Sequence, residues 1–413
     1  MRILVWHGYL LSGTGSNIYT QAVVREWARA GHDVTVFCQE PHPERFDLAG
    51  ARAVRPEIGR LLPVFVLDRY EGLDARLLQD FTAAERDTYV EANAAAIRAH
   101  LPADVVFANH VLLGGPVGAA TGERYAVKVH GSELEYAMRG NEELSAWGRE
   151  SLRGAAAVYV GSGHVREVLE EVVGHVERVH EIPPGVDVDE FRPEARDAAL
   201  DALLDECRAD RPNPGNRSER LPDEGNAERL AEWFASGEPT VLYFGKLLYN
   251  KGVHVLLDAL PRVPARGLVV GFGDYRAELE RHAPAGTLFT GPLEHRHLRH
   301  LLPLCEVTVV PSVFPEAFGM VAAEAAAAGS LPIVARHSGL AEVAQEFERE
   351  LSAEYASLVS FESGDVDDLA ATIRSALRIP AGDLEGVRGA VRRTVEERWS
   401  WPRVAERLLE PLS

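Results

Sequence analysis

The sequence is short of cysteine and of long apolar runs. Its three cysteines, Cys38, Cys207 and Cys305, lie far apart without a CxxC spacing, which excludes a disulfide framework and a cysteine-pair zinc knuckle. No stretch reaches the roughly 18 to 20 uncharged apolar residues that a transmembrane helix needs. The apolar run within residues 1–11 is too short for a signal peptide. We therefore expect a cytoplasmic protein without a transmembrane segment, and peripheral attachment to a membrane stays open.

Excess positive charge is also lacking. The 43 basic residues are outnumbered by 63 acidic residues, which gives a formal net charge of −20. The summed field of such a chain repels phosphate backbones and anionic headgroups, so we expect no nucleic-acid partner. Any phosphate-binding site must then be a local group of cations and backbone amides. The rest of the composition, 46% hydrophobic and 26% charged, is that of an ordinary globular protein.

Short strands alternating with helical patterns are what the chain has in abundance. At 413 residues it exceeds the size of one usual core, which favours two domains. Runs that are apolar throughout, such as DVVFAN (104–109) and VTVVPS (307–312), are typical of parallel strands covered on both faces. The predicted fold class is therefore α/β, with two doubly wound, Rossmann-like domains built on parallel sheets.

The domain boundaries follow from a change in composition. Residues 194–238 are rich in Asp, Glu, Arg, Pro, Gly and Asn, so we predict a linker with a polar insertion over residues 186–238. We predict an amino-terminal domain over residues 1–185 and a carboxyl-terminal domain over residues 239–390. Residues 391–413 are predicted to form helices, broken at Trp401-Pro402, that cross back to the first domain.

A glycine-rich loop, SGTGSN (12–17), follows the first predicted strand and precedes a helical run. Its glycines let the backbone turn sharply and approach a ligand, and the amides at the start of the helix face an anion. The full GxGxxG is missing and no acidic residue ends the second strand, which weakens a dinucleotide interpretation. The loop is either a diphosphate or sugar contact or a plain strand-to-helix turn.

Two lysines stand in the first loop of the second domain, in FGKLLYNKG (244–252). Lys246 ends a predicted strand, and Lys251 precedes the glycine at the start of a helix. Two cations and a helix N-terminus make a compact diphosphate clamp in an otherwise acidic chain. Both lysines follow the carboxyl end of a strand, where open α/β sheets bind ligands, which favours function over a solvated pair.

Two glutamates lie eight positions apart in PEAFGMVAAEAAAAGSLPIV (315–334). Glu316 is in the loop after a predicted strand, and Glu324 is in an alanine-rich helix. Carboxylates accept hydrogen bonds from paired sugar hydroxyls, and small side chains allow a close approach of backbone amides. The alternative interpretation is an exposed loop glutamate and an ordinary glutamate on a helix surface.

Together these motifs resemble the retaining glycosyltransferases of family four, which have the GT-B fold. The similarity extends to IPPGVDVDEFRP (182–193), GFGDYRAELE (271–280) and FTGPL (289–293), and it spans the chain except residues 194–238. It implies two domains whose parallel sheets face a central cleft. It also implies retaining, metal-independent transfer of a hexosyl unit from a nucleotide diphosphate sugar, without a cofactor. A UDP-sugar is preferred over GDP-mannose, while the acceptor (a small molecule, a sugar or a lipid) and the oligomeric state stay open.

The resemblance also implies roles for residues on the donor side. Lys251, and Lys246 where the family usually has arginine, would neutralise the diphosphate. Glu324 would bind the ribose hydroxyls, and Glu316 would hold the donor sugar. The other expected donor contacts are Gly15, Ser16, Gly245, Leu293, Ala317, Phe318, Gly319 and Met320.

His130, in KVHGSELEY, matches a position where the family often has a histidine near the transferred sugar. With this match we favour a contact that stabilises charge developing at the anomeric carbon over a purely structural histidine. The predicted catalytic residues are therefore His130, Lys251 and Glu316.

The acceptor is expected to bind to the first domain, because its loops face the other side of the predicted cleft. The candidate residues are Asn109, His110, Glu133, Arg139 and the segment 62–75. No DxD pair lies in a suitable loop, so no metal site is predicted. A nucleotide-sugar-binding protein without transferase activity and a sugar-nucleotide epimerase remain as alternatives. A dehydrogenase would leave the lysines and glutamates without a role.

Overall fold

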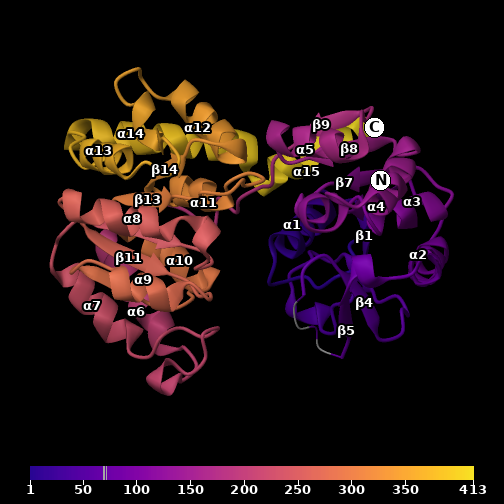
Figure 1. Ribbon diagram of the computed structural model, residues 1–413, viewed down its shortest axis with the longest axis horizontal. Helices are drawn as coiled ribbons and strands as arrows, with labels where there is room; N and C mark the ends of the chain where they lie inside the picture. The colour runs from indigo at the N-terminus through magenta and orange to yellow at the C-terminus, as the bar shows by residue number, and fades with distance from the viewer. Residues whose placement is uncertain (68–69, 71) are drawn as a thin grey trace. The chain divides into compact units, whose positions relative to one another are not determined.

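The computed structural model describes residues 1–67, 70 and 72–413, and the chain divides into two compact units (Figure 1). The first unit contains Met1–Gly185 and Trp401–Ser413, and the second contains Val186–Ser400. Each unit has its own parallel sheet between helical layers, so the predicted class of two Rossmann-like α/β domains is confirmed. No helix among the described residues is both long enough and apolar enough to span a membrane.

The first unit is built on a seven-stranded parallel sheet with the order β3-β2-β1-β6-β7-β8-β9. Every residue of β6 is buried, as expected for a strand covered on both faces. The strand order reverses between β1 and β6, and such a switch point is where open α/β sheets bind ligands. The strands are β1 (Arg2–Trp6), β2 (Asp33–Phe37), β3 (Arg52–Val54), β6 (Val105–Asn109), β7 (Tyr125–Lys128), β8 (Ala157–Val160) and β9 (Val179–Glu181).

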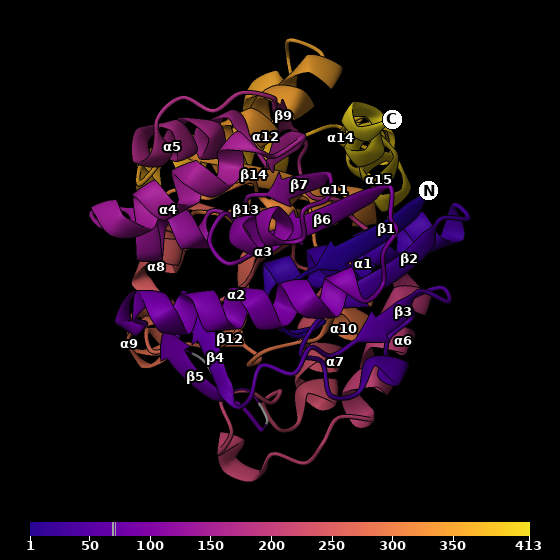
Figure 2. The ribbon, with the colours of Figure 1, turned by 90° about the vertical axis from the view of Figure 1, so that its right-hand side faces the viewer.

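Helices cover both faces of this sheet (Figure 2). One face packs against α2 (Ala83–Arg98), α3 (Gly114–Ala120), α4 (Glu142–Arg153) and α5 (Gly163–Val173), and the other against α1 (Gly15–Arg29) and α15 (Trp401–Leu409). A further two-stranded parallel sheet consists of β4 (Leu61–Val64) and β5 (Asp74–Leu77). Polar caps fix several of these helix starts, such as the reciprocal capping box between Thr82 and Glu85 at α2.

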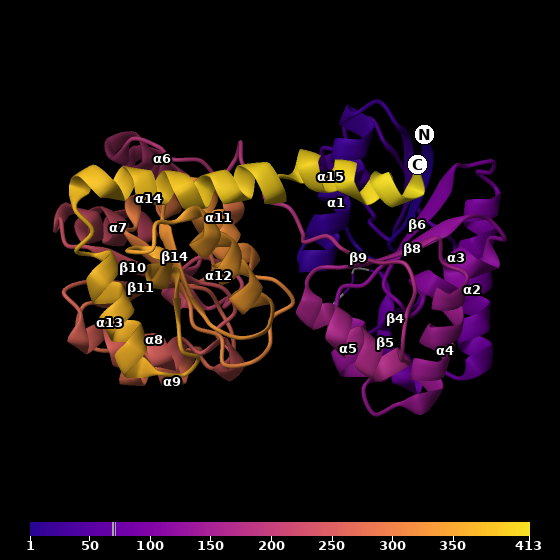
Figure 3. The same cartoon turned by 90° about the horizontal axis from the view of Figure 1, so that it is seen from above.

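Helix α15 comes from the far end of the sequence and lies beside α1 (Figure 3). The indole N–H of Trp27 in α1 donates to the carbonyl of Ala405 at 2.8 Å, and the Tyr159 hydroxyl donates to that of Leu408 at 2.6 Å. Of the predicted crossing segment 391–413, only residues 401–413 belong to the first unit. Residues 391–400 belong to the second unit, because they complete α14 and a π-helical turn that are packed there.

The second unit is built on a six-stranded parallel sheet with the order β12-β11-β10-β13-β14-β15. Here the order reverses between β10 and β13, which places a second switch point at the carboxyl ends of these two strands. The strands are β10 (Thr240–Phe244), β11 (Arg266–Val270), β12 (Thr287–Phe289), β13 (Val307–Val310), β14 (Leu331–Ala335) and β15 (Ser360–Phe361).

The helices of the second unit include one that is buried almost all round. Its alanines from Ala322 to Ala328 are inaccessible, which explains why small residues fill α11: they let it pack closely against β13, β14 and α14. The helices are α6 (Arg196–Arg208), α7 (Asn226–Ala235), α8 (Val253–Ala259), α9 (Arg276–His282), α10 (His295–Leu301), α11 (Met320–Ala328), α12 (Ser338–Glu350), α13 (Val366–Ala376) and α14 (Ala381–Thr394).

The prediction of a linker with a polar insertion over residues 186–238 is wrong. This segment contains α6 and α7, whose apolar faces enter the core of the second unit through Leu203, Leu230 and Trp233. The Trp233 indole also donates to the Thr240 hydroxyl of β10 at 3.0 Å. Charged residues on the outer faces of both helices dominate the composition, and they conceal the helical spacing of the buried residues.

Candidate functional site

The switch point of the second sheet brings together a lysine and a glutamate that were predicted from separate motifs. Lys251 lies in the turn that follows β10, and Glu316 lies in the loop that follows β13. The Lys251 Nζ atom is 2.5 Å from Glu316 Oε1, and both side chains are partly exposed. Strands β10 and β13 are neighbours in the sheet, so the loops that follow them begin side by side. This explains why two residues 65 positions apart in the sequence meet here.

Two serines also hold Glu316, one at its carboxylate and one at its backbone. The Ser312 hydroxyl donates to Glu316 Oε1 at 2.6 Å, and the Glu316 backbone N–H donates to the Ser338 hydroxyl at 2.9 Å. His337 donates from Nε2 to the Ser312 carbonyl at 2.6 Å, so its Nδ1 accepts from Ser338 at 2.9 Å. Sequence reasoning missed these three supporting residues. Their position directly after β13 and β14 was the available signal, since polar residues at adjacent strand ends gather at one sheet edge.

Two glycines in these loops are required by close packing of the backbone. A Cβ atom on Gly252, whose φ is +68°, would lie 1.9 Å from the carbonyl oxygen of Pro311. Gly319 has a φ of +150°, and a Cβ there would lie 2.8 Å from the side chain of Leu340. Both positions therefore favour glycine, and the one at Gly252 keeps the loop after β10 against the loop after β13.

The remaining predicted contacts of this loop differ in exposure. Ala317 is exposed, Gly319 and Met320 are half-buried, and Met320 begins α11. Phe318 is buried, and its ring packs edge-on against Trp399 with 5.0 Å between ring centroids. Phe318 therefore anchors the loop, while the backbone around it remains close to the surface.

Lys246 is exposed and has no side-chain partner among the described residues, whereas its carbonyl accepts a hydrogen bond from the Tyr243 hydroxyl at 2.7 Å. The preceding Gly245 is half-buried and has a φ of +149°. Of the 43 basic residues of the chain, three are lysines, namely Lys128, Lys246 and Lys251. All three lie at or just beyond the carboxyl ends of parallel strands, so arginine supplies nearly all of the positive charge elsewhere.

Glu324 is buried in α11, with 6% of the residue exposed. Burial raises the pKa of Glu324 to about 7; His295, whose Nε2 is 4.0 Å from Glu324 Oε1, opposes this shift, and Glu190 adds to it. Leu293, predicted beside the nucleotide base, is buried two residues before His295. Sequence reasoning did not single out His295.

The glycine-rich loop of the first unit lies at the carboxyl end of β1. Gly15 is exposed and is the first residue of α1, and Ser16 follows with its hydroxyl 3.2 Å from that of Thr14. No side chain caps the start of α1 at Thr14. The first amides of this helix are therefore not occupied by a capping side chain, which suits a contact with an anion.

His130 follows β7 and is held by Asn109, the last residue of β6. Because the Asn109 amide donates to the Trp6 carbonyl at 3.2 Å, its oxygen accepts from His130 Nε2 at 2.8 Å. Burial lowers the pKa of His130 well below its usual range, with further contributions from His110, Lys128 and His7. The imidazole is thus neutral, and its Nδ1 carries the lone pair.

His110 and Glu133 form a buried pair beside it. Glu133 Oε2 accepts from His110 Nδ1 at 3.2 Å, and Oε1 accepts from the backbone N–H groups of Val111 and His130 at 3.3 and 3.1 Å. Burial alone would raise the pKa of Glu133, but His110 and these hydrogen bonds together lower it. His110 adopts a φ of +72°, and its buried Nε2 has no hydrogen-bond partner among the described residues. Strained backbone with an unpaired polar atom is typical of functional sites.

Aromatic side chains that sequence reasoning missed enclose this pair. The His110 ring lies 5.5 Å from Tyr9, 5.1 Å from Phe65 and 6.1 Å from His7 between ring centroids. Burial, together with the neighbouring His110, lowers the pKa of His7 to about 3. The signal for His7 and Tyr9 was their position just after β1, at the switch point.

The other two predicted acceptor elements are placed differently. Arg139 is exposed and binds Glu135 at 2.8 Å and Glu171 at 2.5 Å, rather than any of the predicted acceptor residues. Within the segment 62–75, the Tyr70 ring lies 6.5 Å from that of Tyr9. Residues 68, 69 and 71 of this segment lie outside the described residues.

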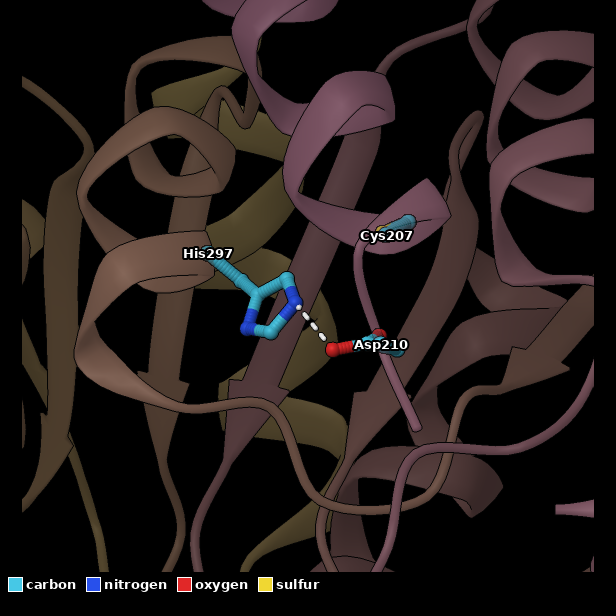
Figure 4. A group of neighbouring side chains, drawn as sticks. All are labelled: Cys207, Asp210 and His297. Carbon is cyan, nitrogen blue, oxygen red and sulfur yellow. Dashed lines mark hydrogen bonds and ion pairs between the residues drawn. The ribbon is translucent and has the colours of Figure 1, made fainter. Parts of the chain in front are cut away.

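One group with metal-ligating atoms lies away from these loops, and it is explained by hydrogen bonding (Figure 4). It consists of Cys207, Asp210 and His297. His297 Nδ1 accepts from the Glu294 backbone N–H at 3.2 Å, so Nε2 carries the proton and donates to Asp210 at 3.1 Å. Arg296 also donates to Asp210. Burial raises the pKa of the Cys207 thiol to about 12, which disfavours the thiolate that a metal needs.

Both units match models of known glycosyltransferase domains. Residues 14–185 match the glycosyl transferase 4-like domain, and residues 227–386 match the glycosyl transferases group 1 domain. Together with the GT-B fold, these matches define the class: the chain belongs to the glycosyltransferases of group 1 type.

Named relatives include glycogen synthase of Mycobacterium tuberculosis, which is 34% identical over 180 residues. That match takes in 41% of this chain and 41% of the relative, so the chain spans about two fifths of the length of the glycogen synthases it matches. D-inositol 3-phosphate glycosyltransferase of Xylanimonas cellulosilytica is 28% identical over 351 residues, which cover 79% of this chain and 76% of the relative.

Solved structures show the same fold at lower identity. Sucrose-phosphate synthase of Thermosynechococcus elongatus has a TM-score of 0.69 and 21% identity, over 98% of this chain and 97% of the other. The Anabaena protein HepE in complex with UDP and glucose has a TM-score of 0.70 and 16% identity, over 100% of this chain and 99% of the other.

Proposed function

We propose that the protein transfers a hexosyl unit from a nucleotide diphosphate sugar, with retention of configuration and without a metal or another cofactor. A UDP-sugar is the donor that we favour, and GDP-mannose is the alternative. The acceptor is a small molecule, a sugar or a lipid. The observation that carries the proposal is the contact between Lys251 and Glu316 at the switch point of the second sheet.

The two residues of this contact suit the two halves of such a donor. An ammonium group neutralises a diphosphate, and a carboxylate accepts hydrogen bonds from sugar hydroxyls. Their separation of 2.5 Å places the two groups side by side, so one donor molecule can contact both. Lys246 adds a second cation without a competing partner among the described residues. The exposed backbone near Ala317 and Gly319 would approach the sugar.

In the proposed reaction, the bond between the anomeric carbon and the diphosphate oxygen breaks. Lys246 and Lys251 stabilise the charge that develops on the leaving diphosphate, which is the task of a divalent ion in other transferases. The acceptor oxygen forms the new bond on the same face, and its proton passes to the leaving diphosphate. Neutral His130 offers a lone pair, rather than a positive charge, toward a cationic anomeric carbon.

We assign the acceptor to the first unit, around His110 and Glu133. The buried Nε2 of His110, which has no partner in the described part of the chain, suits a hydroxyl donor, and the Glu133 contact fixes the ring in the required tautomer. The protein is proposed to work in the cytoplasm.

Nucleotide binding and transfer test the proposal in sequence. The purified protein is screened by thermal shift with UDP, ADP, GDP and their sugar conjugates, and the donor that binds is then offered to an acceptor panel. Glu316→Ala should abolish transfer, while the exposed Glu385→Ala should leave it unchanged. Binding without transfer to any acceptor would favour a non-catalytic binding protein. Conversion of the donor sugar into its epimer would favour an epimerase, and loss of activity with a chelator would contradict metal independence.

A further inference from the structure

Helices α10 and α11 bring a histidine to a buried glutamate in the second unit. His295 is the first residue of α10, in the segment that follows β12, and Glu324 lies in α11, which follows the loop after β13. His295 Nε2 and Glu324 Oε1 are 4.0 Å apart. The ring of Phe191 packs edge-on against His295 with 5.5 Å between centroids, which limits the rotation of the imidazole.

Glu324 lacks the hydrogen bonds that a buried carboxylate needs. Only 6% of the residue is exposed, yet within the described part of the chain no N–H or O–H group donates to its carboxylate. An ionised carboxylate removed from water without donors is costly, and buried polar groups are otherwise paired. The carboxylate is therefore arranged to accept hydrogen bonds from a bound molecule.

The gap between the two side chains has the size of a hydroxyl group. A separation of 4.0 Å is too long for a direct hydrogen bond between Nε2 and Oε1. An oxygen placed about 2.8 Å from both atoms fits between them, with an angle of about 90° at that oxygen. A hydroxyl in this place accepts from His295 and donates to Glu324, so that both of its hydrogen-bonding functions are used.

The start of α10 is held by contacts that fix the backbone at His295. Glu294 and His297 cap the helix reciprocally. His297 also donates a hydrogen bond to Asp210 (Figure 4). Arg296 adds a hydrogen bond to Glu206 of α6 at 2.7 Å. These contacts tie α10 to α6 and its following loop, so His295 is presented from a rigid support.

We propose that His295 is a specificity-determining residue that recognises ribose together with Glu324. The inference rests on the donor site proposed above, where Glu324 is expected to bind the ribose hydroxyls, and it adds His295 to that contact. Glu324 accepts hydrogen bonds from the 2′ and 3′ hydroxyls, and His295 donates to the oxygen of one of them. A nucleotide without these hydroxyls loses all of these contacts.

The test compares ribose and dideoxyribose nucleotides. Binding constants are measured by calorimetry for UDP and 2′,3′-dideoxy-UDP with the wild type, His295→Ala, His295→Gln and the control His282→Ala, an exposed histidine of the same unit. His295→Ala should lower the affinity for UDP about tenfold, which corresponds to one hydrogen bond to a charged group. Its affinity for dideoxy-UDP should stay unchanged. His295→Gln, which keeps an N–H donor, should recover most of the loss, and His282→Ala should change neither.

Two results would overturn the inference. If His295→Ala lowers the affinity for both nucleotides equally, while circular dichroism shows a folded protein, His295 is a structural residue. An unchanged affinity for UDP would leave it without a role in binding. If the wild type binds neither these nor the ADP and GDP pairs, the proposed donor site itself is wrong, and the ribose contact is wrong with it.

Discussion

The carboxyl edges of the two sheets carry the same topology but opposite chemistry. At the first, His7, His110 and Glu133 are at most 2% exposed and are enclosed by aromatic rings. At the second, the side chains of Lys251 and Glu316 are 31% and 24% exposed, and Lys246 is more exposed still. One edge offers buried, oriented hydrogen-bonding groups, and the other offers cations that water and ligands can reach.

This difference follows from what each edge is proposed to bind. A diphosphate is recognised through charge, which requires cations that remain ionised and accessible. A neutral hydroxyl acceptor is recognised through the direction of a few hydrogen bonds, which burial strengthens. The two edges therefore respond differently to substitution, and four experiments rank that difference from the largest expected effect to the smallest.

Replacing Lys251 by alanine should have the largest effect. The change removes a cation from the leaving diphosphate, so transfer should fall by about 100- to 1000-fold and nucleotide affinity by about tenfold. Steady-state kinetics and calorimetry measure the two quantities. Arg393→Ala, which removes an exposed cation from α14, is the matched control. Nucleotide binding at the wild-type level in Lys251→Ala would contradict the proposal that the second sheet edge recognises the diphosphate through its cations.

Replacing Glu133 by alanine should affect stability instead. Three N–H groups, from His110, Val111 and His130, would lose their acceptor, which should cost about 3 kcal/mol and lower the Tm by about 6 to 12 °C. Thermal unfolding checks this, with half-exposed Glu135→Ala as the control that changes little. Nucleotide affinity should stay unchanged, and a parallel loss would show that the two edges are not independent.

The acidity of Glu324 should make nucleotide binding depend on pH. Because burial raises the pKa of Glu324 to about 7, the carboxylate that accepts ribose hydroxyls is protonated below that value. Affinity should therefore fall about tenfold between pH 8 and pH 6. The folded-state pKa exceeds the unfolded one, so the group's contribution to stability is lost as pH rises toward 7.

Glu324→Gln isolates this effect. The variant should bind nucleotide weakly, and its affinity should depend less on pH than that of the wild type. Above pH 7 its Tm should rise relative to that of the wild type. His295 and Glu190 both influence the pKa of Glu324, so His295→Ala is measured in parallel. A profile that Glu324→Gln leaves unchanged would exclude this carboxylate as the source.

Replacing Lys246 by arginine should have the smallest effect. An exposed lysine contacts phosphate as a point charge, whereas arginine can form two parallel hydrogen bonds, so affinity should rise about threefold at most. Calorimetry with UDP measures the change. Because the substitution keeps the positive charge, any change in affinity reports the shape of the cationic group. A loss of affinity would indicate that the compact ammonium group is needed at this position.

The fold was predictable because it follows from apolar runs and their order. Strands such as Val105–Asn109 and Val307–Val310 are apolar along their whole length, and their alternation with helices indicates parallel sheets. The segment 186–238 was not predictable in the same way. Composition averages over both faces of a helix, so the buried side of α7 was outweighed by its charged surface.

The candidate site was predictable only where one residue sits in a recognisable local motif. Lys251 and Glu316 lie in loops with glycines and strand ends that mark them in the sequence, although their contact was not foreseen. His337 and His295 lie in no such motif. Their roles depend on which strand ends become neighbours in the sheet and how α10 is oriented, and a single sequence does not state either.

The scarcity of lysine makes the three amines convenient spectroscopic labels. Expression with ¹³C-labelled lysine would mark Lys128, Lys246 and Lys251, so a spectrum would contain few signals. Lys128 is buried and donates to the Ile182 carbonyl at 3.0 Å, and burial lowers its pKa to about 7. Its signal should therefore titrate near neutrality, while those of Lys246 and Lys251 should shift when a diphosphate is added. In most proteins the signals of many lysines overlap, but here one experiment can follow both sheet edges.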